Sequence, residues 1–502
     1  MNSRNTMSMP ASAPPHRQHV RTFALVWTGL TLVIGACTFI SIYAATGLAA
    51  SGIGTGNSGI APAAISPNIT QTSGDGTQPV AAVPTQVPTL VAIQVTNTNV
   101  PATVAPAKAV AQAATQAAAP PTATIIPIQD TDFDLGVAVQ DNPDANTYKN
   151  WVDMAGKQLK LNWIKSQVDW SAVEKAKGQI DWSSLDTTVN MMNAANVKVM
   201  LSITHAPKWS RDPGAQTTTA TQQFNGPPAN PQDLADLITA ILKRFPGKVQ
   251  AIEVWNEINL DREWATAPQT LDPKRYVTLL KTAHDAIKAV DPNVIVISAA
   301  LAPTGANIPG RVVDDFVYFK NLIDAGMLKY ADCAGAHANG NNVSPTANYN
   351  NIPERTPRAT YRGPWDNPHH SWAFKSTLEG YEKMLKDAGS TLKLCVTEFG
   401  WASVEGLQGK APPGFEFAND NTLADQASFT DQAINQMQQS GNIRLAFLFN
   451  LNYGPQSGWT LDPAKGGDNV LWCIIGKDWA VRPVWQKIVD HNFRGQARKA
   501  SS

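Results

Sequence analysis

Charged side chains are almost absent from one long stretch of the chain. Between residues 51 and 125 only Asp75 and Lys108 are charged, and Ala, Pro, Thr and Gln dominate. A segment with so few large apolar groups cannot bury enough surface to offset the entropy lost on ordering. We therefore predict a disordered linker over residues 49–127, extended where proline is frequent.

The chain also lacks an excess of charge and has little cysteine. Lys and Arg together number 40, as do Asp and Glu, which argues against a nucleic-acid-binding protein. There are four cysteines without CxxC spacing, and no His-x-His follows the first expected strand, so we expect neither a metal nor a cofactor. Cys333, Cys395 and Cys473 lie in the globular part, where we expect buried free thiols because three cysteines cannot all pair.

Residues 22–48 contain no charged side chain at all. Such a run exceeds the ~20 residues needed to cross the hydrocarbon core of a bilayer. Arg4, Arg17 and Arg21 precede it, and no acid appears before Asp75. The positive-inside rule then predicts a cytoplasmic tail over residues 1–21, a single transmembrane anchor over residues 22–48 and an exported remainder. A cleaved signal peptide, which would leave a secreted protein, is the alternative, because the run ends in small residues.

The remaining residues, 128–497, have a globular composition. Short β-branched runs alternate there with helical patterns, which is typical of a parallel sheet built from βα units. Eight strands are predicted, over residues 133–140, 161–168, 197–204, 249–256, 294–300, 331–337, 392–399 and 444–451. The clearest helices are expected over residues 272–290 and 422–439. Eight such units predict a (β/α)8 TIM barrel, whose functional site lies at the carboxyl ends of the strands.

Two glutamates come at the ends of strands in this scheme. Glu257 ends the fourth strand and Glu398 ends the seventh, so both are expected at the mouth of the barrel, facing each other. A pair of carboxyl groups across a cleft can cleave a glycosidic bond, one as proton donor and the other as nucleophile. Glu253, four residues before Glu257, is expected to be a buried structural carboxylate paired with a base.

The sequences around the two glutamates resemble the strand-four and strand-seven motifs of the clan A glycoside hydrolases. These are Trp255-Asn256-Glu257 and Thr397-Glu398-Phe399-Gly400, supported by EKAKGQIDWS over residues 174–183, which is similar to family 39-like and cellulase-like members. The resemblance implies a retaining enzyme with Glu257 as acid/base and Glu398 as nucleophile. It also implies substrate contacts from Asn256 to a sugar 2-hydroxyl and from His205 and His337.

This chain departs from the family pattern at three places. Lys165 stands where an arginine is usual, no aromatic residue follows His337, and the eighth strand ends without its usual tryptophan, although Trp459 or Trp472 could take that place. Aromatic faces can stack on pyranose rings, and the remaining candidate sugar-binding side chains are Trp170, Trp209, Trp401 and Tyr453.

The sequence therefore predicts hydrolysis of β-linked glycans by double displacement, with an oligo- or polysaccharide substrate and the membrane as partners. A non-catalytic cell-surface glycan-binding protein on a degenerate barrel is the alternative, motivated by the three departures. A purely structural role in the envelope is a third possibility.

Overall fold

The computed structural model describes residues 133–215, 225–353, 368–462 and 467–494. The predicted tail, anchor and linker lie outside these residues. Within the described ranges, no helix combines the length and the apolar character needed to cross a bilayer.

Eight parallel strands form a nearly closed barrel, as predicted. The hydrogen-bonded order is β5-β4-β3-β2-β1-β8-β7-β6, and a bridge from Ile297 in β5 to Cys333, the residue before β6, closes the ring. The strands are β1 Asp134–Ala138, β2 Trp163–Asp169, β3 Lys198–Thr204, β4 Ala251–Val254, β5 Ile295–Ser298, β6 Ala334–Gly340, β7 Leu394–Trp401 and β8 Ile443–Leu448.

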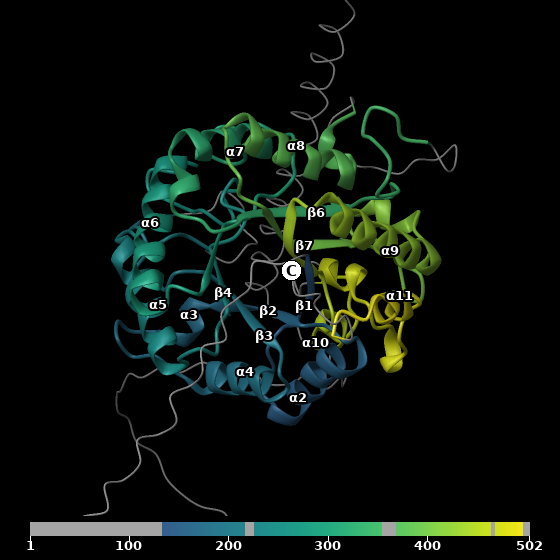
Figure 1. Cartoon of the computed structure of the whole chain (residues 1–502), viewed down its shortest axis with the longest axis horizontal. Coiled ribbons are helices and arrows are strands. Elements are labelled where there is room, and N and C mark those ends of the chain that lie inside the picture. Colours follow the sequence, from purple (N-terminus) through teal and green to yellow (C-terminus); the bar gives the residue numbers. More distant parts are fainter. Residues whose placement is uncertain (1–132, 216–224, 354–367, 463–466, 495–502) are drawn as a thin grey trace, which may run out of the picture. The chain divides into compact units, whose positions relative to one another are not determined.

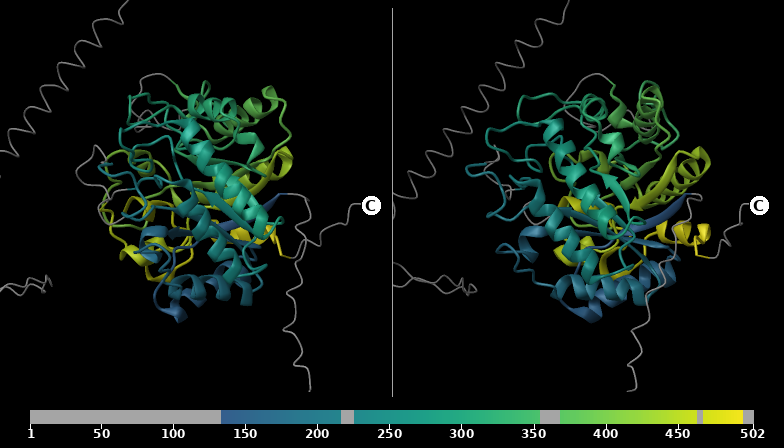
Figure 2. Two further views of the ribbon diagram at one scale, coloured as in Figure 1. Left: turned by 90° about the vertical axis from the view of Figure 1, so that its left-hand side faces the viewer. Right: turned by 60° about the vertical axis from the view of Figure 1, so that its left-hand side comes forward.

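Helices surround the strands in a ring (Figure 1), and two side views show them outside the barrel (Figure 2). The α-helices are α2 Ala145–Asp153, α3 Trp170–Val173, α4 Ser183–Ala194, α5 Pro231–Arg244, α6 Pro273–Val290, α7 Asp315–Asp324, α8 Phe374–Asp387, α9 Leu423–Ser440, α10 Tyr453–Ser457 and α11 Val484–His491. Short 3-10 segments include η4 Glu416–Asn419, η6 Gly467–Trp472 and η7 Lys477–Trp479. In α6 the side chain of Asp272 accepts a hydrogen bond from the amide of Lys274, and Pro273 occupies the first turn, which confirms the predicted helix start.

The core has two main layers, one between strands and helices and one inside the barrel. The inner layer is formed by Trp163, Met200, Ala251, Ile295, Ile297, Cys333, Cys395, Leu445 and Phe447. Within it Cys333 and Cys395 form a disulfide with their Cα atoms 5.7 Å apart. The prediction of free thiols is therefore wrong for this pair, because the sixth and seventh strands are neighbours and bring the two cysteines together. Cys473 is buried and free, as expected.

A register shift between β6 and β7 positions one of the two glutamates. Ala336 lies opposite Val396, but the next residue, His337, lies opposite Glu398, so Thr397 is skipped. This irregularity places Glu398 beside a histidine of the neighbouring strand.

The chain that leaves β4 is held in an unusual backbone conformation. Trp255 has φ of 76° and Glu257 has φ of 40°, values that are costly for residues other than glycine. The amide of Glu257 donates to the carbonyl of Ala300 at 2.9 Å, and the indole of Trp255 donates to the carbonyl of Glu263 at 2.8 Å. These hydrogen bonds fix the backbone from which Glu257 projects.

Candidate active site

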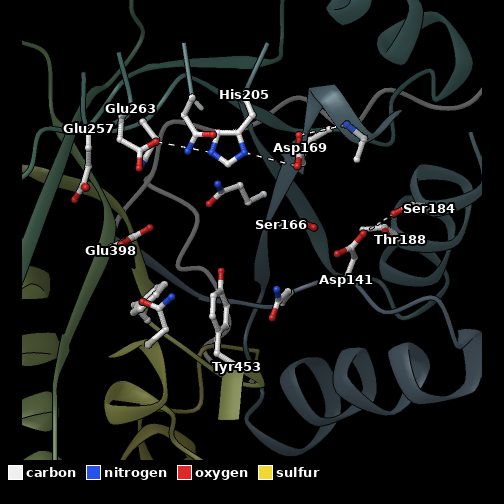
Figure 3. Close-up of a pocket in the computed structure, with 18 of the residues that line it drawn as sticks. Asp141, Ser166, Asp169, Ser184, Thr188, His205, Glu257, Glu263, Glu398 and Tyr453 are labelled. Carbon is white, nitrogen blue, oxygen red and sulfur yellow. Dashed lines mark hydrogen bonds and ion pairs between the residues drawn. The ribbon is translucent and has the colours of Figure 1, made fainter. Parts of the chain in front are cut away.

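A cavity of about 720 Å³ opens at the carboxyl ends of the strands. Glu257, Glu398, Asn256, His205 and Tyr453 all line it. In Figure 3, Glu257 and Glu398 lie on one side of this cavity, and His205 lies between Glu263 and Asp169. The structure thus brings both predicted acids into one pocket, at the end of the barrel where such sites are found.

Both oxygens of the Glu257 carboxylate are engaged. Oε1 lies 3.1 Å from Nδ1 of His337, and Oε2 accepts a hydrogen bond of 2.7 Å from Nη2 of Arg262. The side chain of Glu257 is only 15% exposed. Burial by itself would raise the pKa of Glu257, but the hydrogen bond from His337 and the charge of Arg262 outweigh it and lower that pKa to about 2.

Glu398 is paired with a buried lysine. Nζ of Lys165 lies 3.0 Å from Oε1 of Glu398 and 3.4 Å from Oε2 of Glu253. Thr397 also donates its hydroxyl to Glu253 at 2.7 Å. Burial favours the neutral amine, but the two carboxylates more than compensate and raise the pKa of Lys165. The lysine therefore stays charged and forms an ion pair with Glu398. Glu253 is a buried acid paired with a base, as predicted.

One imidazole links the two acids. The Nε2 atom of His337 lies 3.9 Å from Oε1 of Glu398, while its Nδ1 contacts Glu257. His337 is 1% exposed, and its burial, which disfavours the charged ring, is outweighed by Glu398 and Glu257, so its pKa is raised.

His205 forms a second charged contact in the pocket wall. Its two ring nitrogens lie 3.8 Å from Oδ2 of Asp169 and 3.8 Å from Oε2 of Glu263. Burial lowers the pKa of this histidine, but the two acids beside the ring outweigh it and raise that pKa to about 9. His205 is therefore an imidazolium at neutral pH.

Comparison with protein families identifies the family of this chain. The sequence model of the cellulase family, glycosyl hydrolase family 5, matches residues 142–425, which is more than half of the chain. The chain belongs to glycosyl hydrolase family 5. The resemblance to cellulase-like members of the clan A glycoside hydrolases is confirmed.

Solved structures similar to this family 5 chain include three from family 39. The enzyme from the gut symbiont Bacteroides cellulosilyticus WH2 is 18% identical over 71% of this chain and 62% of its own, with a TM-score of 0.48. That from Xanthomonas axonopodis pv. citri is 17% identical over 72% and 66%, with a TM-score of 0.48. A β-xylosidase from Caulobacter crescentus is 16% identical over 73% and 72%, with a TM-score of 0.46. The chain thus spans less than two thirds of the length of the first two, and none of the curated proteins compared with it matches.

The structure separates the aromatic candidates for sugar binding in this family 5 chain. Tyr453 lines the pocket, and so does Trp472, one of the two suggested replacements for the missing tryptophan. Trp170 and Trp401 are fully buried: Trp170 donates its indole N–H to Glu174, and Trp401 packs against Phe374 and Phe429. Trp209 and Trp459 are half-buried and are not among the residues that line the pocket.

Several pocket residues were not expected from the sequence. Arg262, Glu263, Asp468, Asp141 and Asp169 all line the cavity. In Figure 3, Glu263 lies next to Glu257, whereas Asp141 and Asp169 lie on the other side of the cavity. The only signal available was position, because Asp141 and Asp169 follow or end strands β1 and β2. Arg262 lies in an irregular segment and Asp468 in the short 3-10 segment η6, and the sequence pattern does not reveal the direction of either.

Over the described part of the chain, no group of three or more His, Cys, Asp or Glu side chains is arranged to hold a metal ion.

Proposed function

We propose that this protein is a retaining glycosidase for β-linked glycans, with Glu257 as acid/base and Glu398 as nucleophile. The observation that carries the proposal is the placement of these two carboxylates, from β4 and β7, in one pocket with His337 between them. Retaining enzymes hold the two groups ~5 to 5.5 Å apart, so that one can reach the anomeric carbon and the other the glycosidic oxygen.

The first step requires an ionised nucleophile and a protonated acid. Lys165 places a positive charge 3.0 Å from Glu398, the carboxylate that attacks the anomeric carbon. The glycosidic bond breaks as the bond to Glu398 forms, and the leaving oxygen takes the proton carried by Glu257.

The second step requires Glu257 as a base. A water molecule attacks the anomeric carbon of the glycosyl-enzyme, Glu257 removes its proton, and Glu398 is released. The ion pair with Arg262 and the contact with His337 favour the ionised form of Glu257 that this step needs.

Two other pocket residues suit contacts with a sugar. Asn256 is buried, and within the described chain its Oδ1 has no hydrogen-bond partner. We assign it to the 2-hydroxyl of the sugar at the cleaved bond. Nε1 of Trp472 is likewise left without a partner among the described residues, and this indole replaces Trp401 as our candidate aromatic platform.

The test is the stereochemistry of rescue. Glu398→Ala and Glu257→Ala are offered azide together with activated aryl β-glycosides of glucose, xylose and cellobiose. If the roles are correct, Glu398→Ala forms the α-glycosyl azide and Glu257→Ala forms the β-glycosyl azide. Glu379→Gln, a change at an exposed residue on α8, is the matched control and should retain wild-type turnover. Equal activity of wild type and Glu398→Ala on every substrate would falsify the assignment.

A non-catalytic glycan-binding protein is the second candidate function. It is favoured by the engagement of both Glu257 oxygens, which leaves no oxygen free to donate a proton in the unliganded site. Oligosaccharide binding without any product after long incubation would support this candidate and exclude the enzyme.

We also propose that the domain is exported and held at the cell membrane by residues 22–48, with secretion after signal cleavage as the alternative. The uncharged run supports membrane insertion, and the Cys333–Cys395 disulfide suits an oxidising compartment. Membrane retention after carbonate washing, with cleavage of the domain by protease added outside the cells, is the expected result. Recovery of all protein from the medium would indicate secretion.

A further inference from the structure

Arg262 is an unusual neighbour for a proton donor. A guanidinium has only N–H donors and no acceptor, so it can contact the charged carboxylate but not a protonated one at the same oxygen. Its Nη2 lies 2.7 Å from Oε2 of Glu257, while His337 occupies Oε1. In this arrangement Glu257 has no oxygen that can both carry a proton and present it to a glycosidic oxygen.

Arg262 also has other carboxylates within reach. Its Nε lies 3.8 Å from Oε1 of Glu263, and among the described residues Oε2 of Glu263 has no hydrogen-bond partner. Asp468, from η6, lines the same cavity and interacts electrostatically with Arg262; burial raises the pKa of Asp468 despite that interaction. The guanidinium can therefore leave Glu257 without losing all its negative partners.

The backbone around Arg262 is fixed, so the movement belongs to its side chain. The amide of Asp261 donates to the carbonyl of Arg311 at 2.8 Å, and the amide of Trp264 donates to the carbonyl of Leu260 at 3.0 Å. The Arg262 side chain is 44% exposed, whereas its partners Glu257 and Glu263 are 15% and 14% exposed.

We propose that Arg262 is a displaceable counter-ion: a sugar that enters on the leaving-group side moves the guanidinium from Glu257 towards Glu263 and Asp468, and Glu257 then takes up a proton from solvent on the freed oxygen. Arg262 is thus a positioning residue that couples occupancy of the pocket to the protonation of the acid. The inference rests on the proposed function, because it concerns the same proton donor.

Other titratable or charged groups also interact with Glu257 or line the same cavity, and they stay in place in this scheme. They are His337 from β6, Glu398 from β7, Lys165 from β2, Tyr381 from α8, and Glu263 and Asp468 in the pocket wall. Arg262, by contrast, donates to Oε2, the oxygen of Glu257 that His337 does not contact.

The main test compares pH profiles. The basic limb of kcat/KM reports Glu257 in the free enzyme, and that of kcat reports it in the complex. The substrate is cellohexaose or xylohexaose, whichever the wild type cleaves. In wild type, the midpoint of the basic limb of the kcat profile should lie at least one pH unit above that of the kcat/KM profile. In Arg262→Met the two limbs should converge and kcat/KM at pH 7 should rise about tenfold, since one pKa unit is a factor of ten in protonation. A 2,4-dinitrophenyl β-glycoside, whose leaving group needs no acid, should show no such rise.

Arg311→Met is the matched control, because Arg311 is 45% exposed and pairs with Asp261 at 3.4 Å outside this contact. It should keep the wild-type split between the two limbs. Coincident limbs in wild type, or an equal effect of Arg262→Met on both leaving groups, would overturn the proposal.

A measurement without turnover separates this proposal from the proposed function. Carbon-13 NMR of labelled glutamate, assigned with Glu257→Gln, gives the midpoint for protonation of Glu257 in the free protein. That midpoint should rise by at least one pH unit in Arg262→Met and stay unchanged in Arg311→Met. An unchanged midpoint in Arg262→Met overturns the proposal even if the protein cleaves glycans. A raised midpoint without cleavage of any glycan leaves the ion pair established and the proposed function excluded.

Discussion

Glu398 and Glu257 share one pocket but lie in contrasting surroundings. Glu398 contacts Lys165, which is 3% exposed and held from below by the fully buried Glu253. Glu257 instead contacts Arg262, which is 44% exposed at the pocket wall. The partner of Glu398 is fixed in the core, whereas the partner of Glu257 can move. One pocket thus surrounds two glutamates differently, as the proposed roles of nucleophile and acid/base require.

The largest expected effect concerns the nucleophile. Glu398→Gln should lower kcat/KM by about 10⁴-fold or more, because the covalent intermediate cannot form, and the loss should be the same for good and poor leaving groups. Steady-state kinetics on 2,4-dinitrophenyl β-glycosides and on oligosaccharides checks this. A loss confined to the oligosaccharides would reverse the two roles.

The second effect separates Glu257 from Glu398. Glu257→Gln should lower kcat on oligosaccharides by about 10²- to 10⁴-fold, the usual contribution of general acid catalysis. Formation of the glycosyl-enzyme from a dinitrophenyl glycoside should be nearly unchanged, which a burst of dinitrophenolate would reveal. Absence of the burst would contradict the assignment of Glu257 as the acid.

The third effect tests whether the ion pair between Lys165 and Glu398 is a fixed part of the buried core. Lys165→Met removes the charge shared by two buried carboxylates and should cost about 3 to 5 kcal/mol of unfolding free energy. Urea denaturation measures this cost, and Lys165→Met combined with Glu253→Gln should recover part of it. The exposed pair of Lys320 with Asp324 provides the control, since Lys320→Met should cost less than about 1 kcal/mol. Equal losses of unfolding free energy in Lys165→Met and Lys320→Met would contradict the view that Lys165 is a fixed, buried partner of Glu398.

The smallest effect concerns His205, whose pKa is raised from 6.5 to about 9 in the folded protein. A raised pKa contributes stability that is fully present below pH 6.5 and is lost as the pH rises through about 9. The contribution is on the order of 3 kcal/mol at most. The difference in unfolding free energy between wild type and His205→Gln should therefore shrink between pH 6.5 and 9. A difference independent of pH would mean that His205 is neutral.

The sequence allowed the barrel and both acids to be predicted, because strand ends and the surrounding motifs locate them. The sequence prediction did not distinguish the tryptophans that line the pocket from those that are buried in the core. Trp401 follows Glu398 by three residues, and side chains alternate along a strand, so Trp401 points to the helices while Glu398 points inward. The opposite orientations of Trp401 and Glu398 could therefore have been predicted from the sequence.

Other features could not be predicted from the sequence. The pairing of Cys333 with Cys395 depends on which strands are neighbours, and the shift that aligns His337 with Glu398 depends on a bulge without a sequence signature. Arg262 reaches Glu257 through a turn stabilised by contacts with residues about 50 positions away.

The closure of the barrel has a consequence for the width of the cleft. β4, which leads to Glu257, neighbours β5, and β7, which carries Glu398, neighbours β6. Where β5 meets β6, the described residues form one bridge instead of a ladder, whereas the other seven neighbouring pairs form ladders. Backbone hydrogen bonds from the amide of Ser298 to the carbonyl of Cys333 and from the amide of Asp332 to the carbonyl of Val296 hold this seam together. The separation of Glu257 and Glu398, and with it the width of the cleft, therefore depends on these few contacts.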